Sequence, residues 1–215
     1  YTFGGLVPAD ITFTPDGKMY CIKAPSDIYE LDTITGIQSF VCSYDWLLHV
    51  PFGPSLETLN DSLLLTDLHD TLFALNIYSC TKTPLGIIGY EYLVAEGDYH
   101  FFSDGDMVWY KGFLYLVAKG KLFKIKLNES SFLIESSEVV NTSTEDIPLS
   151  YGLSLYKNDT LDWGIVSFAG GRGEVLYIDP ETGSFDTLCI DITSMDDPLY
   201  CNTFGSASLN SRMTN

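Results

Sequence analysis

Short apolar runs recur in a pattern that repeats about every 45 to 54 residues along this 215-residue chain. Turn signals separate the runs, at Pro15-Asp16-Gly17, Asn60-Asp61, Lys111-Gly112 and Asn158-Asp159. Such residues between two strand-like runs are typical of β-hairpins. Helical periodicity is nearly absent, because Gly, Pro or β-branched residues interrupt every stretch of about eleven residues. The pattern therefore predicts an all-β fold made of a repeated unit.

Each repeat contains four strand-like runs. The first-strand anchors are Ile11, Leu56, Val108 and Leu153, and the third-strand aromatics are Tyr29, Phe73, Phe123 and Tyr177. Four strands in roughly 45 residues are typical of a β-propeller blade, in which neighbouring blades bury each other's faces. The third-strand aromatics would lie between adjacent blades. We therefore predict a β-propeller, and the matched aromatics favour it over the alternative, a two-sheet β-sandwich.

The repeats divide the chain into four complete blades and part of a fifth, within a single domain. The predicted blades cover residues 9–44, 53–89, 104–140 and 151–190, with a partial blade at 203–215 and 1–8. A closed ring requires a completed last blade. We therefore expect the chain to be a segment of a longer protein, and a thin fifth blade is the alternative.

The charge of the chain limits its possible partners and suggests its compartment. The chain has 29 acidic and 11 basic residues, a net charge of −18, and no apolar run approaching a membrane span. Nucleic acid and an anionic membrane surface are therefore poor partners. The scarcity of Lys, with many Tyr, Thr, Ser and Asp residues, favours an extracellular or surface protein.

The five cysteines form no Cys-x-x-Cys pair, and an odd number leaves one thiol free or paired between chains. Two interpretations remain, small buried side chains or a disulfide such as Cys189–Cys201. Cys21 and Cys42 fall on the second and fourth strands of one blade, about 9–10 Å apart. That separation exceeds disulfide reach, so we predict that these two are not bonded to each other.

Four strings of the repeat have a distinctive composition, and they are Gly105-Asp-Met-Val-Trp-Tyr-Lys-Gly-Phe-Leu-Tyr-Leu116, Ala9-Asp-Ile-Thr-Phe-Thr-Pro-Asp-Gly-Lys-Met-Tyr20, Leu176-Tyr-Ile-Asp-Pro-Glu-Thr-Gly183 and Phe204-Gly-Ser-Ala-Ser-Leu209. These strings resemble a propeller found in surface proteins of gliding and other Bacteroidetes, near the large gliding-motility adhesins. The second blade departs from the pattern, with Pro54-Ser55 where Gly-Asp would stand. The resemblance implies secretion, display on the cell surface and no catalytic residues.

The same resemblance suggests O-glycosylation at Asp-Ser/Thr followed by an aliphatic residue. The candidate acceptors are Thr33, Ser62, Thr71, Thr160 and Thr187. The alternative is that Asp-Thr-Leu is simply favourable chemistry at the start of a strand.

Candidate ligand-binding residues are few. Asp10 and Asp106 occupy equivalent positions at the start of innermost strands and would face the central channel together, as ligand contacts or as acceptors for loop amides. Arg172, in a glycine-rich hairpin tip, is a candidate for an anionic group. Trp46, between two blades, is a candidate for stacking on a sugar ring, whereas Trp109 and Trp163 are expected in the core.

Catalytic chemistry finds little support. The sequence contains no Gly-x-Ser-x-Gly and no histidine near a cysteine at ligand spacing. Calcium is the one cofactor considered, at Asp104–Asp106 or Asp196-Asp197, although neither fits a calcium-loop frame.

We therefore expect a non-catalytic surface module for adhesion or scaffolding, which binds a glycan or a protein, including other copies of itself, at one face. A stand-alone secreted lectin is the alternative, and a metal-dependent hydrolase or lactonase is a third possibility.

Overall fold

The structure is a computed structural model of the chain. It describes residues 10–23, 27–44, 55–89, 92, 103–140, 145–148, 150–157, 163–169 and 174–190. The predicted partial fifth blade, at 203–215 and 1–8, lies outside these ranges. None of the described residues belongs to a helix long and apolar enough to cross a membrane.

Four antiparallel sheets of four strands each make up the described structure, as predicted. Blade 1 comprises β1 (Asp10–Phe13), β2 (Met19–Lys23), β3 (Asp27–Leu31) and β4 (Gln38–Ser43). Blade 2 comprises β5 (Glu57–Thr58), β6 (Leu63–Leu68), β7 (Thr71–Asn76) and β8 (Thr81–Ile87). Blade 3 comprises β9 (Ser103–Tyr110), β10 (Phe113–Ala118), β11 (Lys121–Leu127) and β12 (Ile134–Val139). Blade 4 comprises β13 (Ser150–Lys157), β14 (Trp163–Ala169), β15 (Glu174–Ile178) and β16 (Phe185–Ile190).

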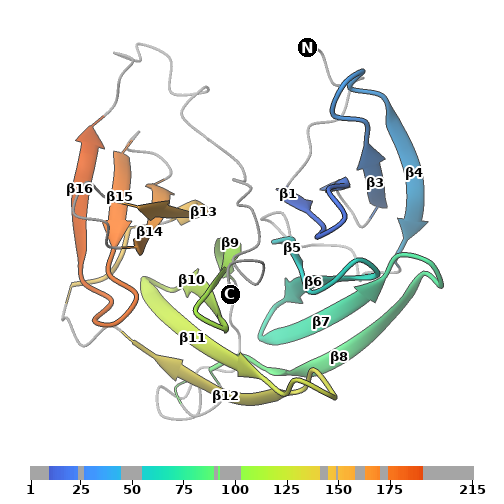
Figure 1. Cartoon of the computed structure of the whole chain (residues 1–215). Helices are drawn as coiled ribbons and strands as arrows, with labels where there is room; N and C mark the ends of the chain where they lie inside the picture. The colour runs from blue at the N-terminus through green and yellow to red at the C-terminus, as the bar shows by residue number, and fades with distance from the viewer. Residues whose placement is uncertain are drawn as a thin grey trace.

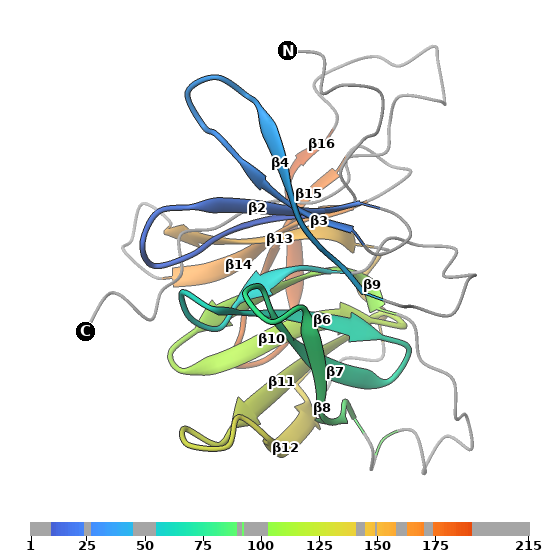
Figure 2. The same ribbon diagram turned by 90° about the vertical axis from the view of Figure 1, so that its right-hand side faces the viewer.

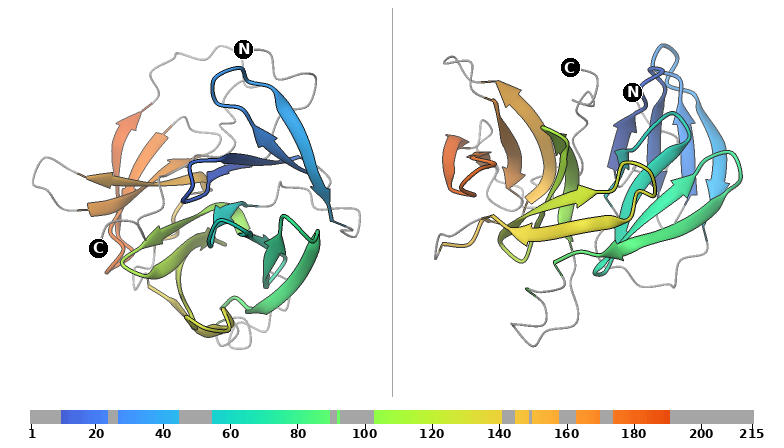
Figure 3. Two further views of the ribbon diagram at one scale, coloured as in Figure 1. Left: turned by 45° about the vertical axis from the view of Figure 1, so that its right-hand side comes forward. Right: turned by 60° about the horizontal axis from the view of Figure 1, so that its bottom comes forward.

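The blades are arranged around a common axis as a four-bladed β-propeller. Figure 1 shows β1, β5, β9 and β13 nearest the centre and β4, β8, β12 and β16 at the rim. In each blade the turn between the first and second strands and the turn between the third and fourth strands lie at the same end of the sheet. We call this end of the propeller the turn face, and it is on the left of Figure 2. Figure 3 shows the outer strands β8 and β12 meeting at the rim, where Gly86 lies against Ile134.

Apolar side chains pack between neighbouring blades in three seams. The seam between blades 1 and 2 is built around Tyr20, Ile28 and Leu75, and the seam between blades 3 and 4 around Val108 and Leu176. The seam between blades 2 and 3 contains Leu72, Leu116, Phe123 and Trp109. The described residues form no comparable cluster between blades 4 and 1.

Strand register corrects two positions of the predicted repeat. Tyr29, Phe73 and Phe123 pair with equivalent second-strand residues, but the corresponding blade 4 residue is Leu176, not Tyr177. Similarly, the first-strand anchor of blade 3 is Met107 rather than Val108. Both errors follow from alternation, because a shift of one residue moves a side chain to the other face. Trp109 is in the core as predicted, with 1% of its surface exposed, and its indole N–H donates to Thr58 O across 2.8 Å.

The four β3–β4 type turns share one construction. A side-chain oxygen of the first residue accepts backbone N–H groups two or three residues later, as in an Asx turn. The first residues are Asp32, Asn76, Asn128 and Asp179. The fifth residue has a positive φ, and the residues at this position are Gly36, Cys80, Phe132 and Gly183. Blades 2 and 3 therefore place a side chain where blades 1 and 4 have glycine.

A disulfide between Cys42 and Cys80 joins two blades. Cys42 lies in β4 of blade 1 and Cys80 in the β7–β8 turn of blade 2, with Cα atoms 5.5 Å apart. The sequence alone did not predict this bond. The prediction that Cys21 and Cys42 are not bonded to each other is confirmed, and Cys21 is a buried free thiol. Cys201 lies outside the described residues, so the suggested Cys189–Cys201 bond is not tested.

Candidate functional site

Three carboxylic acids are buried where the inner strands converge on the axis. Asp10 begins β1, Glu57 begins β5 and Asp106 lies in β9, and each has only 2 to 3% of its surface exposed. A buried carboxyl group is unfavourable unless hydrogen bonds satisfy its oxygens. The partners of these oxygens therefore define what the site can do.

The Asp10 carboxylate joins blade 1 to blade 2. Its Oδ1 accepts the N–H of Ile11 at 2.8 Å, and its Oδ2 accepts the N–H of Leu56 from the neighbouring blade at 2.6 Å. The side chain therefore satisfies a backbone amide at the start of its own strand and a second amide in the inner segment of the next blade.

The Asp106 carboxylate repeats this arrangement between blades 3 and 4. Its Oδ1 accepts the N–H of Met107 at 2.6 Å, and its Oδ2 accepts the N–H of Leu153 at 3.3 Å. The Asp10 and Asp106 side chains are also hydrogen-bonded to each other. The two equivalent residues therefore contact each other, with backbone amides as their other partners, whereas their role as ligand contacts stays a prediction.

Blades 2 and 4 have no aspartate at the equivalent position. Blade 2 has Ser55, which hydrogen-bonds to Asp67 of β6 within its own blade, and blade 4 has Gly152. The aspartates thus alternate around the axis, and each accepts the first-strand amide of a blade that lacks one.

Glu57 completes the set and was not predicted from the sequence. Its Oε1 accepts the N–H of Thr58 at 2.6 Å and the hydroxyl of Thr12, from blade 1, at 3.2 Å. The sequence signal was present, since Glu57 is an acid within the apolar inner run Leu56–Leu59. The departure of blade 2 from the repeat at Pro54-Ser55 concealed it.

Burial dominates the electrostatics of the three acids. It raises the pKa of Asp10 to about 8, although the hydrogen bonds from Asp106, Leu56 and Ile11 act in the opposite direction. Burial raises the pKa of Glu57 to about 8, with a further contribution from the Asp106 charge. Burial, then the neighbouring Asp10 carboxyl, holds the pKa of Asp106 well above its ordinary value. These acids therefore favour their protonated forms near neutral pH.

The chemistry open to the site follows from this burial. A general acid or nucleophile must reach the substrate, but these oxygens are occupied by backbone amides, hydroxyls and one another. Among the described residues, no group of three His, Cys, Asp or Glu side chains is placed to hold a metal ion. The geometry therefore suits a structural junction between blades.

The other candidate residues are distributed as follows. Trp46, Arg172 and Thr160 lie outside the described residues. Thr33 in the β3–β4 turn and Thr187 in the rim strand β16 are exposed. Ser62 and Thr71 are partly buried, and their hydroxyls donate to Asn60 and Asp70. The structure thus leaves Thr33 and Thr187 as the accessible acceptors among the described ones.

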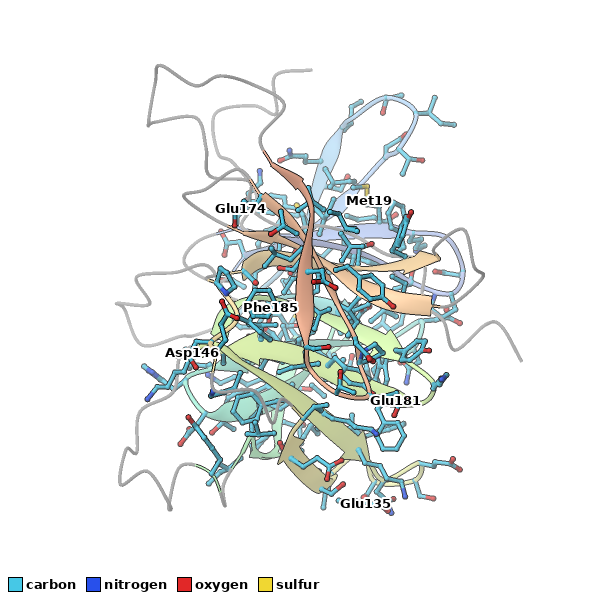
Figure 4. The ribbon with its side chains drawn as sticks, turned by 90° about the vertical axis from the view of Figure 1, so that its left-hand side faces the viewer. Met19, Glu135, Asp146, Glu174, Glu181 and Phe185 are labelled. Carbon is cyan, nitrogen blue, oxygen red and sulfur yellow. A yellow bond between two sulfur atoms is a disulfide. The ribbon has the colours of Figure 1, made fainter. Side chains whose placement is uncertain are left out.

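Two further ion pairs lie in blades 3 and 4, away from the axis. Figure 4 shows Asp146 and Glu181 beside blades 3 and 4. Asp146 pairs with Lys121 at 2.8 Å, and Glu181 pairs with Lys111 of blade 3 at 3.5 Å.

No protein-family model and no curated protein matches this sequence. Solved structures do resemble the fold. A structural genomics protein of unknown function from Bacteroides thetaiotaomicron aligns with a TM-score of 0.62 at 13% identity, over 95% of this chain and 54% of its own. An auxiliary nutrient binding protein from the same organism aligns with a TM-score of 0.52 at 10% identity, over 84% of this chain and 56% of its own.

An enzyme shares the architecture as well. The PQQ-bound aldose sugar dehydrogenase of Streptomyces coelicolor aligns with a TM-score of 0.54 at 12% identity, over 87% of this chain and 68% of its own. At these identities the likeness shows the propeller fold alone. This chain spans little more than half the length of the two Bacteroides structures.

Proposed function

We propose that this chain is a non-catalytic, extracellular propeller module of Bacteroidetes surface-protein type, which binds a glycan or a protein in adhesion or scaffolding. The observation that carries the proposal is how the three carboxylic acids at the propeller axis are bonded. Asp10, Glu57 and Asp106 are buried and hydrogen-bonded between blades. This arrangement favours a rigid frame that presents its surface to a ligand.

The disulfide supports the extracellular setting. Bonds such as Cys42–Cys80 persist in oxidising compartments and are rare in the reducing cytosol. Of the propeller structures described above, one is an auxiliary nutrient binding protein, a second point in favour of a binding role.

The binding face we propose is the end opposite the turn face. Inner strand β1 begins at that end with Asp10, and Asp106 holds the equivalent position in β9. Trp46 follows β4, and Arg172 stands between β14 and β15 in the chain order. An indole ring stacks on sugar rings, and a guanidinium group binds carboxylates or phosphates. These two residues are therefore the ones to test.

A glycan array probed with the purified chain tests the proposal. We expect binding to a subset of printed polysaccharides, at least tenfold weaker in Trp46→Ala. The control is Tyr78→Ala, because Tyr78 is an aromatic on the turn face with 71% of its surface exposed. Equal binding by the Trp46 variant and wild type would contradict the assignment of the face.

The alternatives give different outcomes. Capture of a defined surface protein, or of a second copy of the chain, without any glycan signal would indicate scaffolding. Glycan binding by a native protein with an intact mass of 23.9 kDa would favour the stand-alone lectin. Turnover of an ester or lactone substrate that a chelator abolishes would contradict the non-catalytic proposal.

A further inference from the structure

One pair of side chains connects the inner strands of all four blades. Asp10 of β1 accepts the Leu56 amide of blade 2, and Asp106 of β9 accepts the Leu153 amide of blade 4. The hydrogen bond between the two carboxyl groups then joins these two halves across the axis.

This central bond has a chemical requirement. An ionised carboxylate only accepts hydrogen bonds, so two carboxyl groups can bond to each other only when at least one is protonated. Two ionised carboxylates at this separation repel each other in a buried environment.

The charged groups nearby strengthen that requirement. Glu57 of β5 faces the pair, and its charge, when it is ionised, raises the pKa of Asp10 further. Asp67 of β6 is bonded to Ser55 within blade 2. The described side chains of β13 carry no charge, and this strand contributes the Leu153 amide. The surroundings therefore favour retention of the proton.

We propose that the propeller axis is an acid-held latch, in which a proton between Asp10 and Asp106 ties the four inner strands together and its loss at rising pH loosens the blades. This inference is independent of the proposed binding function, because it concerns the cohesion of the frame and not the ligand.

The direction of the pH effect follows from linkage. The pKa of Asp10 is about 8 in the folded protein and 3.8 for an unperturbed aspartate. Between these values the folded state retains a proton that the unfolded state has lost, so stability falls as pH rises. The contribution is fully present below about pH 4 and is lost by about pH 8. Ordinary surface carboxylates stabilised by cations would give the opposite slope.

Hydrogen exchange of two backbone amides reports the latch directly. Leu56 and Leu153 donate to the two aspartates, so their protection depends on the pair. After correction for intrinsic exchange rates, we expect their protection factors to fall at least tenfold between pH 5.5 and 8. That change is well within the roughly tenfold per pH unit that the loss of one proton allows. The Leu114 amide, in the centre of blade 3, is the internal reference and should change less.

Conservative variants separate the latch from general charge repulsion. Asp106→Asn keeps a group that donates to Asp10 but removes one of the three buried acids, so the fall in unfolding midpoint between pH 5.5 and 8 should shrink by at least about a third, while Glu57 still titrates with a raised pKa. Glu129→Gln removes one exposed charge from the β11–β12 turn and should leave the pH dependence unchanged. Equal pH dependence in wild type and Asp106→Asn would overturn the proposal.

A measurement on the wild-type protein covers the case in which that variant does not fold. Infrared spectra of the folded protein should show the carbonyl band of a protonated carboxylic acid at pH 6, which diminishes as pH rises past 8. Glu57→Gln should retain part of this band, because the aspartate pair remains. Absence of the band from folded wild type at pH 6 would refute the latch.

Discussion

The seam between blades 1 and 2 and the seam between blades 3 and 4 use the same hydrogen bond at the axis but differ at the periphery. Asp10 and Asp106 accept equivalent first-strand amides at the two seams. Further out, the first seam has the Cys42–Cys80 disulfide, whereas the second has an exposed Lys111–Glu181 pair. These two seams therefore share the hydrogen bond at the axis and differ in the outer tie, which is covalent in one and a weak ion pair in the other.

Among changes at the two seams, removal of the disulfide should reduce the unfolding free energy most. Cys42→Ser/Cys80→Ser releases a loop with a sequence separation of 38, and we expect a loss of about 4 kcal/mol in unfolding free energy. Urea denaturation measures the difference. Reductant should reproduce the loss in wild type and have no effect on the double variant. A loss below about 1 kcal/mol would show that the apolar contacts alone hold this seam.

The backbone at Cys80 offers a finer test. Its φ of 54° is one that glycine adopts easily, and Gly36 and Gly183 occupy the same turn position in blades 1 and 4. Both Cys80→Gly and Cys80→Ser lose the disulfide. We expect the glycine variant to be more stable than the serine variant by about 0.5–1 kcal/mol in urea denaturation. The reverse order would mean that the turn imposes no strain on a side chain.

The ion pair at the other seam should contribute less. Lys111 and Glu181 are about 60% exposed, at 63% and 58%, and 3.5 Å apart, so Lys111→Ala should cost less than about 1 kcal/mol. The cost should decrease further in 1 M salt because of screening. Lys126→Ala, which removes the exposed pair with Glu135 inside blade 3, is the matched control. A salt-independent loss above about 1 kcal/mol would show that Lys111 matters through packing.

Calcium removal should produce the smallest change. The axial carboxyl oxygens already accept amides and hydroxyls, whereas Ca²⁺ requires six to eight oxygen ligands. We therefore expect the thermal midpoint at pH 7 to be equal in EDTA and in millimolar Ca²⁺. A rise with Ca²⁺ that Asp10→Asn abolishes would instead place a cation at the axis.

The sequence predicted the blade architecture because the relevant signals are local. Strand alternation and the turns at Pro15-Asp16-Gly17 and Lys111-Gly112 depend on neighbouring residues. The meeting of Asp10 with Asp106 was also predictable, because equivalent positions in a rotational repeat converge on the axis.

Contacts between blades were harder to predict. The disulfide joins a rim strand to the turn of the next blade, and no spacing rule within one blade indicates it. One signal was available, since Cys80 stands where two other turns have glycine. The one-residue shift at Leu176 shows a second limit, because Leu176 and Tyr177 both suit a strand and only the pairing decides which one faces the seam.

The β3–β4 turns have a consequence for how such a surface can diversify. In each blade an Asx side chain begins the turn and a Ser or Thr stands three residues later, whose hydroxyl accepts a backbone N–H two residues further on in three of the four turns. The two residues between them vary from blade to blade. These two positions hold Thr33-Ile34, Ile77-Tyr78 and Glu129-Ser130 on the same backbone. Substitutions at the two variable positions of each turn can therefore change the surface that the turn presents, while the blade beneath it keeps its fold.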